Sequence, residues 1–203
     1  MLDFLKSKTL PKIGVDEFWF AQLDKDETGS TPEFGTSIKV PGLVNVGFNP
    51  NAQTDTFNAD NGPYASAAQT GNLQLTVGLA DVPPELRAIW FGQYYEDGVL
   101  EEGQINPIEM AIAYRVKKSD NSYRYFWLYK TKAAPPSEST DTQGTSINFQ
   151  SDSITINCSM LVSTGKYRRV LDDDDPSLPE GVTPEDIAEN WFKDPLWLPE
   201  ATI

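Results

Sequence analysis

Residues 109–130 constrain the fold of this chain more than any other stretch. Two runs rich in aromatic and β-branched residues flank a short polar turn there, and this pattern is typical of a β-hairpin. Asp120 and Asn121 tolerate the positive φ angles of a two-residue turn, and such a turn would place Tyr114 opposite Trp127. We therefore predict an antiparallel sheet organised around this hairpin, with its aromatic residues in the core.

The two faces of this hairpin differ in composition, because side chains alternate along a strand. One face is mainly apolar and aromatic, whereas the other mixes apolar and basic side chains. The mixed face carries Ala111, Ala113, Arg115, Lys117, Arg124, Phe126, Leu128 and Lys130. A sheet face in open contact with water is more uniformly polar. We therefore expect a helix of the same chain, or a neighbouring subunit, to cover part of the mixed face.

Four further stretches have the alternation or composition of strands. They are residues 15–21, 37–48, 73–79 and 148–162. Pro41 and Gly42 interrupt the second stretch, which predicts a bend or an edge position there. The single cysteine, Cys158, lies in the last stretch and is expected to be a small buried apolar residue.

Two short helices are also predicted. The first covers residues 83–91, with Asp81 as its N-cap, and ends at Gly92. The second begins after Thr183, whose side chain is suited to cap it. The apolar stripe of this second helix comprises Ile187, Trp191 and Phe192. A stripe of this size needs a docking surface, either on the core of the same chain or on a neighbour.

The composition excludes several classes of protein. The chain has no histidine and one cysteine, which removes Ser-His-Asp and Cys-His catalytic arrangements, thiolate metal sites and an internal disulfide framework. Carboxylate-only chemistry is compatible with this composition, but no pair of acids stands out among the 30 acidic residues. We therefore expect a protein that is not an enzyme and that uses no cofactor and no metal.

The length of 203 residues favours one domain with an extension. We expect a β domain with an N-terminal arm at residues 1–170, and an acidic linker with a helical extension at residues 171–203. The four consecutive aspartates at 172–175 lack the spacing of an EF-hand loop and predict a solvated linker. No apolar run is long enough to cross a membrane, and the N-terminal residues do not have the pattern of a secretory signal.

Two long polar segments, residues 49–72 and 131–145, interrupt the strand pattern. They hold too few large apolar residues to fill a core, and long polar connections are uncommon in compact domains. Each is either a mobile surface loop or a segment that becomes ordered against another subunit. The candidate self-assembly residues within them are Phe57, Asn58, Asp60, Asn61, Tyr64, Glu138, Asp141 and Gln143.

The order and spacing of four stretches resemble the phi13-type family of major tail proteins of long-tailed bacteriophages. These stretches are residues 38–64, 71–92, 122–150 and 183–192. The resemblance implies a tail tube fold, which is a mainly β, antiparallel sandwich or barrel-like fold with one core helix and a short C-terminal helix. It also implies a structural subunit that forms hexameric rings, and rings that stack into a hollow tube through which the genome passes.

The resemblance further implies where and with what the chain assembles. The expected partners are other copies of the chain, a tape measure protein and a tail terminator, in the tail of a virion that assembles in the host cytoplasm. The family is associated with non-contractile tails. The net charge of −14 then fits a tube that phage DNA passes through without specific binding, because nucleic acid is a polyanion.

Three alternatives remain open from the sequence. Another tail component, such as a tail terminator or a baseplate part, would share much of the same pattern. A carbohydrate-binding β-sandwich would need several exposed, coplanar aromatic rings. A carboxylate-only glycoside hydrolase would need two acids at a defined separation in a cleft.

Overall fold

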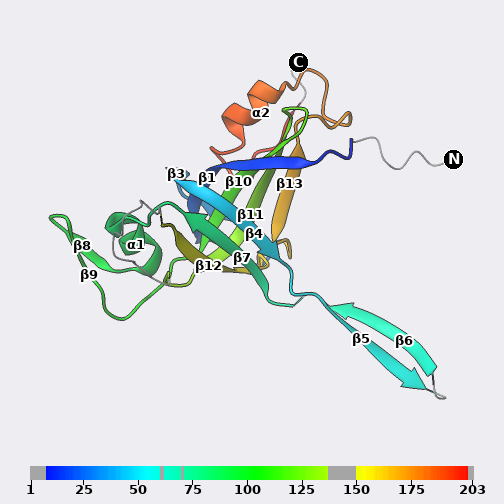
Figure 1. Ribbon diagram of the computed structural model, residues 1–203, viewed down its shortest axis with the longest axis horizontal. Helices are drawn as coiled ribbons and strands as arrows, with labels where there is room; N and C mark the ends of the chain where they lie inside the picture. The colour runs from blue at the N-terminus through cyan, green and yellow to red at the C-terminus, as the bar shows by residue number, and fades with distance from the viewer. Residues whose placement is uncertain (1–7, 60–61, 70, 137–149, 201–203) are drawn as a thin grey trace, which may run out of the picture.

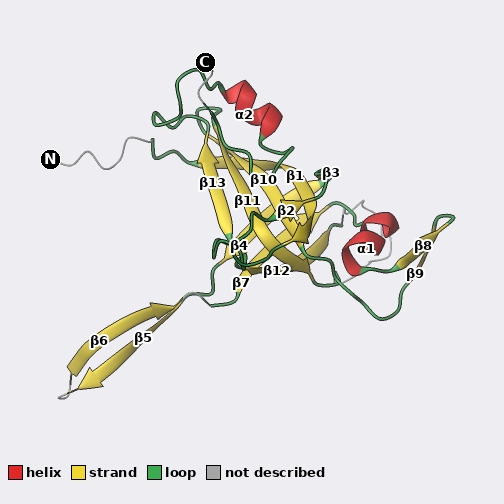
Figure 2. Ribbon diagram, turned by 180° about the vertical axis from the view of Figure 1, so that it is seen from behind, coloured by secondary structure: helices red, strands yellow, loops and turns green. Residues whose placement is uncertain are grey.

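The computed structural model describes residues 8–59, 62–69, 71–136 and 150–200. A curled main sheet forms the body, helix α1 lies at one end of it, and helix α2 lies beside the far ends of the central strands (Figures 1 and 2). The helices are α1 (Pro84–Phe91) and α2 (Pro184–Asn190). The strands are β1 (Lys12–Lys25), β2 (Glu33–Phe34), β3 (Ile38–Val40), β4 (Leu43–Asn49), β5 (Gln53–Ala59), β6 (Gly62–Gln69), β7 (Leu73–Leu79), β8 (Tyr94–Glu96), β9 (Val99–Glu101), β10 (Met110–Lys118), β11 (Tyr123–Ala133), β12 (Asp152–Ser159) and β13 (Arg168–Asp172).

The main sheet has the strand order β2-β1-β10-β11-β12-β7-β4, with β13 also paired to β11 and β3 also paired to β1. Every strand pairing given for the described residues is antiparallel. The predicted mainly β, antiparallel, sandwich-like fold is confirmed. The barrel-like closure is not found, because β4 and β13 remain unpaired with each other across the described part of the sheet.

The β10–β11 hairpin is present, but its predicted register is wrong by one residue. Tyr114 pairs with Phe126, whereas Trp127 pairs with Ala113. The turn contains three residues instead of two: the N–H of Lys118 donates to the carbonyl of Ser122 over 2.8 Å, and Asn121 has a φ of 69°. A three-residue turn with its last residue in the left-handed region shifts the pairing by one position.

This register places the two groups of aromatic residues on opposite faces of the sheet. The inner face, inside the curl, buries Tyr114 and Phe126, whose rings stack at 4.7 Å between centroids. Phe18 and Phe20 of β1 join them, and both contact the edge or face of the Trp90 ring from α1. The inner core therefore extends from the central strands to α1, which contributes Leu86, Trp90 and Phe91.

The outer face of the central strands is covered by the C-terminal residues of the same chain. Trp127 is fully buried there, and its indole N–H donates to the carbonyl of Trp191 over 2.8 Å. Phe192 stacks on Trp19 at 5.6 Å and contacts Tyr125. The predicted composition of this face is wrong, because the shifted register puts Phe126 and Leu128 on the inner face and Tyr125, Trp127 and Tyr129 on the outer one. Of the two covers left open by the sequence, the structure shows residues of the same chain, with Ile187, Trp191 and Phe192 buried.

Three helix ends were predicted, and two of them are confirmed. Thr183 caps α2 through a reciprocal capping box with Asp186, and Gly92 ends α1 in the left-handed conformation. The prediction of Asp81 as N-cap of α1 is wrong. Pro83 occupies that position without a side-chain cap, and the prolines that follow Val82 leave fewer N–H groups for a cap to satisfy.

The prediction of a solvated acidic linker at residues 172–175 is also wrong. Asp172 ends β13 and binds Arg124 through two hydrogen bonds of 2.5 and 2.6 Å. Asp173 is buried and accepts from the N–H of Tyr123 over 2.8 Å. Lys118, with a side chain 3% exposed, lies 2.5 Å from Asp174 and 3.2 Å from Asp172. Basic groups from the β10–β11 hairpin therefore neutralise a run that would otherwise repel itself. The domain division at residue 170 stays a prediction.

Candidate self-assembly site

Strands β5 and β6 form a separate two-stranded hairpin that extends far from the body of the molecule (Figures 1 and 2). Three predicted self-assembly residues lie on it: Phe57 pairs with Ala65, Asn58 pairs with Pro63, and Tyr64 lies in β6 between these pairs. Asp60 and Asn61 lie outside the described residues. The described residues of the first polar segment thus form an extended hairpin in this structure, whereas the sequence pattern predicted a loop or a segment that becomes ordered against another subunit.

The root of the hairpin is held by short contacts between its two legs. The legs continue from β4 and β7, which pair with each other as far as Asn49 and Gln74. Asn51, with a φ of 44°, donates from its side-chain amide to the carbonyl of Asn72 over 2.5 Å. A Cβ atom at Gly71 would lie 2.2 Å from the carbonyl oxygen of Asn51. Glycine is therefore required at residue 71 for the legs to approach this closely.

The second predicted segment begins too early, because residues 131–133 belong to β11, pair with β12 and bury Thr131 and Ala133. Glu138, Asp141 and Gln143 lie outside the described residues, which end on one side at residue 136 and resume at residue 150. The flanking strand is regular up to Ala134, whose N–H donates to the carbonyl of Thr155 over 2.8 Å. The structure therefore brings together the predicted residues of the first segment only.

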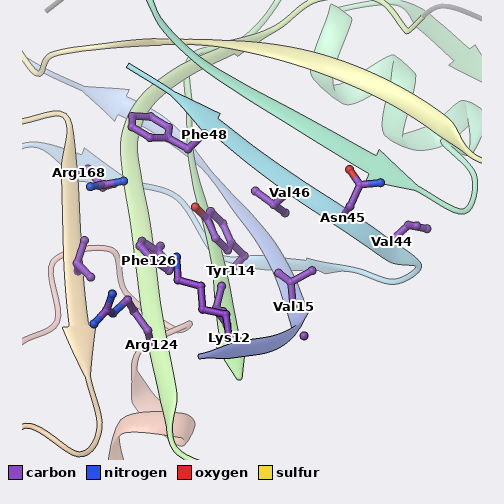
Figure 3. A pocket seen from close by; sticks show the side chains of 13 residues that line it. Lys12, Val15, Val44, Asn45, Val46, Phe48, Tyr114, Arg124, Phe126 and Arg168 are labelled. Carbon is purple, nitrogen blue, oxygen red and sulfur yellow. The ribbon is translucent and has the colours of Figure 1, made fainter. Parts of the chain in front are cut away.

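An open groove of about 570 Å³ lies between β4 and β13, over the inner face of the sheet (Figure 3). Its walls are half-exposed apolar side chains, including Val44 and Val170, at 51% and 44% exposure. Tyr114 and Phe126 form part of its floor, and burial raises the pKa of Tyr114 to about 12. We call this feature the β4–β13 groove. Its complete lining is Lys12, Gly14, Val15, Val44, Asn45, Val46, Phe48, Tyr114, Val116, Arg124, Phe126, Arg168 and Val170.

The charges on the β4–β13 groove are all positive. Lys12, Arg124 and Arg168 line it, and its lining contains no Asp or Glu. Arg124 is paired with Asp172, whereas the guanidinium of Arg168 lies 4.7 Å from the centre of the Phe48 ring. The chain as a whole has a net charge of −14, so a groove lined only by basic charged residues differs in sign from the rest of the molecule. The alternating sequence pattern gave no sign of it, because its residues come from five strands.

The edges of the groove differ in what they contact. At one edge Phe48 of β4 stacks on Tyr167, with 6.2 Å between ring centroids and 8° between planes. Away from this contact the outer edge of β4 and the outer edge of β13 pair with no other strand among the described residues. Backbone N–H and C=O groups on such edges are available to an additional strand.

Other functional arrangements find less support in the described residues. No group of three metal-ligating side chains that could hold an ion occurs among them. Within the part of the chain that the structure describes, most large aromatic rings are buried in the two cores, whereas sugar binding needs several exposed rings. Neither described helix has the length and apolar character needed to cross a membrane.

No protein-family model and no curated protein matches this chain. Among solved structures, the cryo-EM structure of the anti-feeding prophage cap, an AFP tube terminating cap, is similar with a TM-score of 0.43 and 9% sequence identity. The match covers 84% of this chain and 99% of that chain. A likeness at this TM-score carries no conclusion about function, so the geometry of the hairpin and the groove has to support any assignment.

Proposed function

We propose that this chain is a structural subunit of a bacteriophage tail that assembles with copies of itself into the tail tube. Subunits join into hexameric rings, and the rings stack around a channel that conducts DNA. The tail is non-contractile, and tape measure protein and tail terminator are the further partners. The chain has no catalytic role in this assignment.

The projecting β5–β6 hairpin is the observation that supports the proposal best. A two-stranded hairpin on its own is at most marginally stable in water, yet this one extends away from the body in both views (Figures 1 and 2). Among the described residues it pairs with no strand outside itself. Both of its edges can therefore pair with another chain, and a second copy of the protein would supply the missing contacts.

Negative-stain microscopy of the purified chain at high concentration tests the proposal. Regular tubes or stacked six-fold rings are expected. Single rings that never stack would favour a tail terminator or a baseplate part instead. A strict monomer that retains polysaccharide would contradict the proposal and favour a carbohydrate-binding module.

A deletion of residues 58–65 tests the role of the hairpin within the same experiment. The described residues of this segment, 58–59 and 62–65, lie toward the far end of the hairpin and away from the body (Figure 1). The shortened chain should therefore unfold at the same temperature as the full chain but fail to form tubes. Normal polymerisation of the shortened chain would show that the hairpin has no role in assembly.

A further inference from the structure

We propose that the β4–β13 groove is the receptor for the β5–β6 hairpin of a second copy of this chain. The inference rests on the proposed self-assembly and names the surface that the hairpin binds. It follows from three properties of the groove and the hairpin: their charge, their free strand edges, and the direction in which the hairpin extends.

Charge is the first property. Lys12 and Arg168 line the groove, and neither forms an ion pair with a carboxylate among the described residues. The hairpin segment at residues 49–72 contains acidic residues and no lysine or arginine. Asp55, in β5, is one of its acids. Opposite charges on two surfaces of the same chain are complementary between copies, so charge is compatible with this pairing, and the strand edges and the direction of the hairpin single it out.

Free strand edges are the second property. The groove lies between β4 and β13, whose outer edges are unpaired in the described sheet. The hairpin also has unpaired edges, and an added strand gains affinity from main-chain hydrogen bonds while side chains fill adjoining pockets. The apolar walls at Val44 and Val170 offer such a pocket to the apolar residues of the hairpin. A hairpin in the β4–β13 groove could therefore form main-chain hydrogen bonds with the free strand edges and place apolar side chains against the apolar walls.

The direction of the hairpin is the third property. Its legs leave the body from the ends of β4 and β7 and continue outward, so its far end lies well away from the body that carries the groove (Figure 1). The contacts of Asn51 with Asn72 and Gly71 fix this direction at the root. The hairpin of one copy therefore reaches outward to a groove on another copy, which makes the contact intermolecular and repeatable along an assembly.

A charge exchange tests the inference. Arg168→Glu and Asp55→Lys, each alone, should raise the critical concentration for assembly about tenfold or more, the change for 1.4 kcal/mol. The double variant should recover most of the loss, because the pair is restored with its signs reversed. Lys166→Glu makes the same charge change at an exposed turn beside β13 and should assemble like the unmodified chain.

Lys12→Glu provides a second groove variant in case Arg168→Glu fails to fold, since Lys12 is exposed. Assembly by Lys12→Glu or Arg168→Glu at the unmodified concentration would overturn the inference. Failure of the double variant to recover, when both single variants are folded and impaired, would also overturn it. In either of these outcomes the unmodified chain still forms tubes, so the proposed function stands and only the groove inference fails. If the unmodified chain never associates, the proposed function and the groove inference both fail.

Cysteine cross-linking locates the contact directly. One chain carries Val44→Cys in the groove and another carries Ser66→Cys in β6, and the two are mixed before assembly. The native Cys158 is buried, and burial raises its pKa to about 12, so it does not compete for the cross-linker. Cross-links between residues 44 and 66 of different chains are expected. Assembled tubes without cross-links between residues 44 and 66 of different chains would overturn the inference.

Discussion

Asp26 ties the end of β1 to the loop that follows β12. Its carboxylate, 4% exposed, accepts from the ammonium of Lys130 over 2.8 Å. It also accepts from the N–H groups of Val162 and Ser163, each over 2.9 Å. Burial opposes ionisation, but these hydrogen bonds outweigh it and hold the pKa of Asp26 well below its usual value.

We predict that Asp26→Asn lowers the free energy of unfolding by about 2–3 kcal/mol at pH 7, because charge-assisted hydrogen bonds are lost. The stabilisation from Asp26 is complete above its ordinary pKa of 3.8 and is lost as the pH falls below that value. The unfolding free energies of Asp26→Asn and of the unmodified chain should therefore become equal as the pH falls into the acid range. Urea unfolding across this pH range measures the effect.

Asp24→Asn is the matched control for this prediction, because Asp24 is an exposed residue of the same strand. It should leave the unfolding free energy within about 0.5 kcal/mol of the unmodified chain. Equal losses from both substitutions would show that net charge, and not the Asp26 contacts, sets the stability.

Gly71 lies where the two legs of the β5–β6 hairpin approach each other closely, and this position leads to a second prediction at the residue scale. Gly71→Ala should force the two legs of the hairpin apart, because the new Cβ cannot lie 2.2 Å from the carbonyl oxygen of Asn51. Amide exchange in β5 and β6 should become faster while exchange in β7 and β12 stays unchanged. Gly47→Ala, in β4, meets no atom within 4 Å and should change neither. If amide exchange in β5 and β6 is unchanged in Gly71→Ala, the base of the hairpin does not depend on the close approach between residue 71 and the carbonyl oxygen of Asn51.

At the scale of elements, α2 acts as a cover for the outer face of the central strands. Trp191 is fully buried against this face, and its carbonyl receives the indole N–H of Trp127. We predict that Trp191→Ala costs about 3–5 kcal/mol of unfolding free energy, the range for removal of a large core side chain. Denaturant unfolding measures the loss, with Leu198→Ala as a control at a side chain that is 56% exposed. A loss below 1 kcal/mol at Trp191 would mean that α2 docks only weakly.

The elements also show what the sequence could and could not predict. Strand and helix positions follow from local patterns, so the central hairpin, α1 and α2 were placed correctly. The sequence left open whether the chain itself or a neighbour covers the second face of the hairpin. The register of the hairpin was missed because it depends on whether Asn121 adopts the left-handed conformation, which the residue types allow without requiring. The acidic run was misjudged because its partners, Lys118 and Arg124, come from about 50 residues away in the sequence.

The candidate site was predicted in part for the same physical reason. The β5–β6 hairpin lies in one continuous segment, so its unusual polarity is visible in the sequence. The β4–β13 groove has walls from separate strands, and its basic character arises only when Lys12 and Arg168 are brought together by folding. A periodic pattern in the sequence describes neighbouring positions of one element, so it cannot predict a basic groove whose residues come from separate strands. The second polar segment was started too early, since residues 131–133 are part of β11, and the assembly role of residues 137–145 stays a prediction.

The whole molecule is strongly acidic, and this has a consequence for an assembled tube. Charges act on DNA only within about 8 Å at physiological salt, so acids near a channel would repel the phosphates and those on the outside would have no effect. We predict that assembled tubes do not retain double-stranded DNA even at low salt. A gel-shift assay with intact tubes measures this, and a clear shift would contradict the proposed acidic channel.

The strand order around the hairpin root determines how a subunit bears tension. The hairpin legs continue from β4 and β7, and β7 is joined along its length to β12 in the interior of the sheet. A neighbour that pulls on the hairpin therefore pulls along the strand axes, so the hydrogen bonds between β7 and β12 are sheared together instead of parting one by one. A filament built from such subunits would resist stretching through the combined strength of this ladder, and would fail by subunits separating before any one of them unravels.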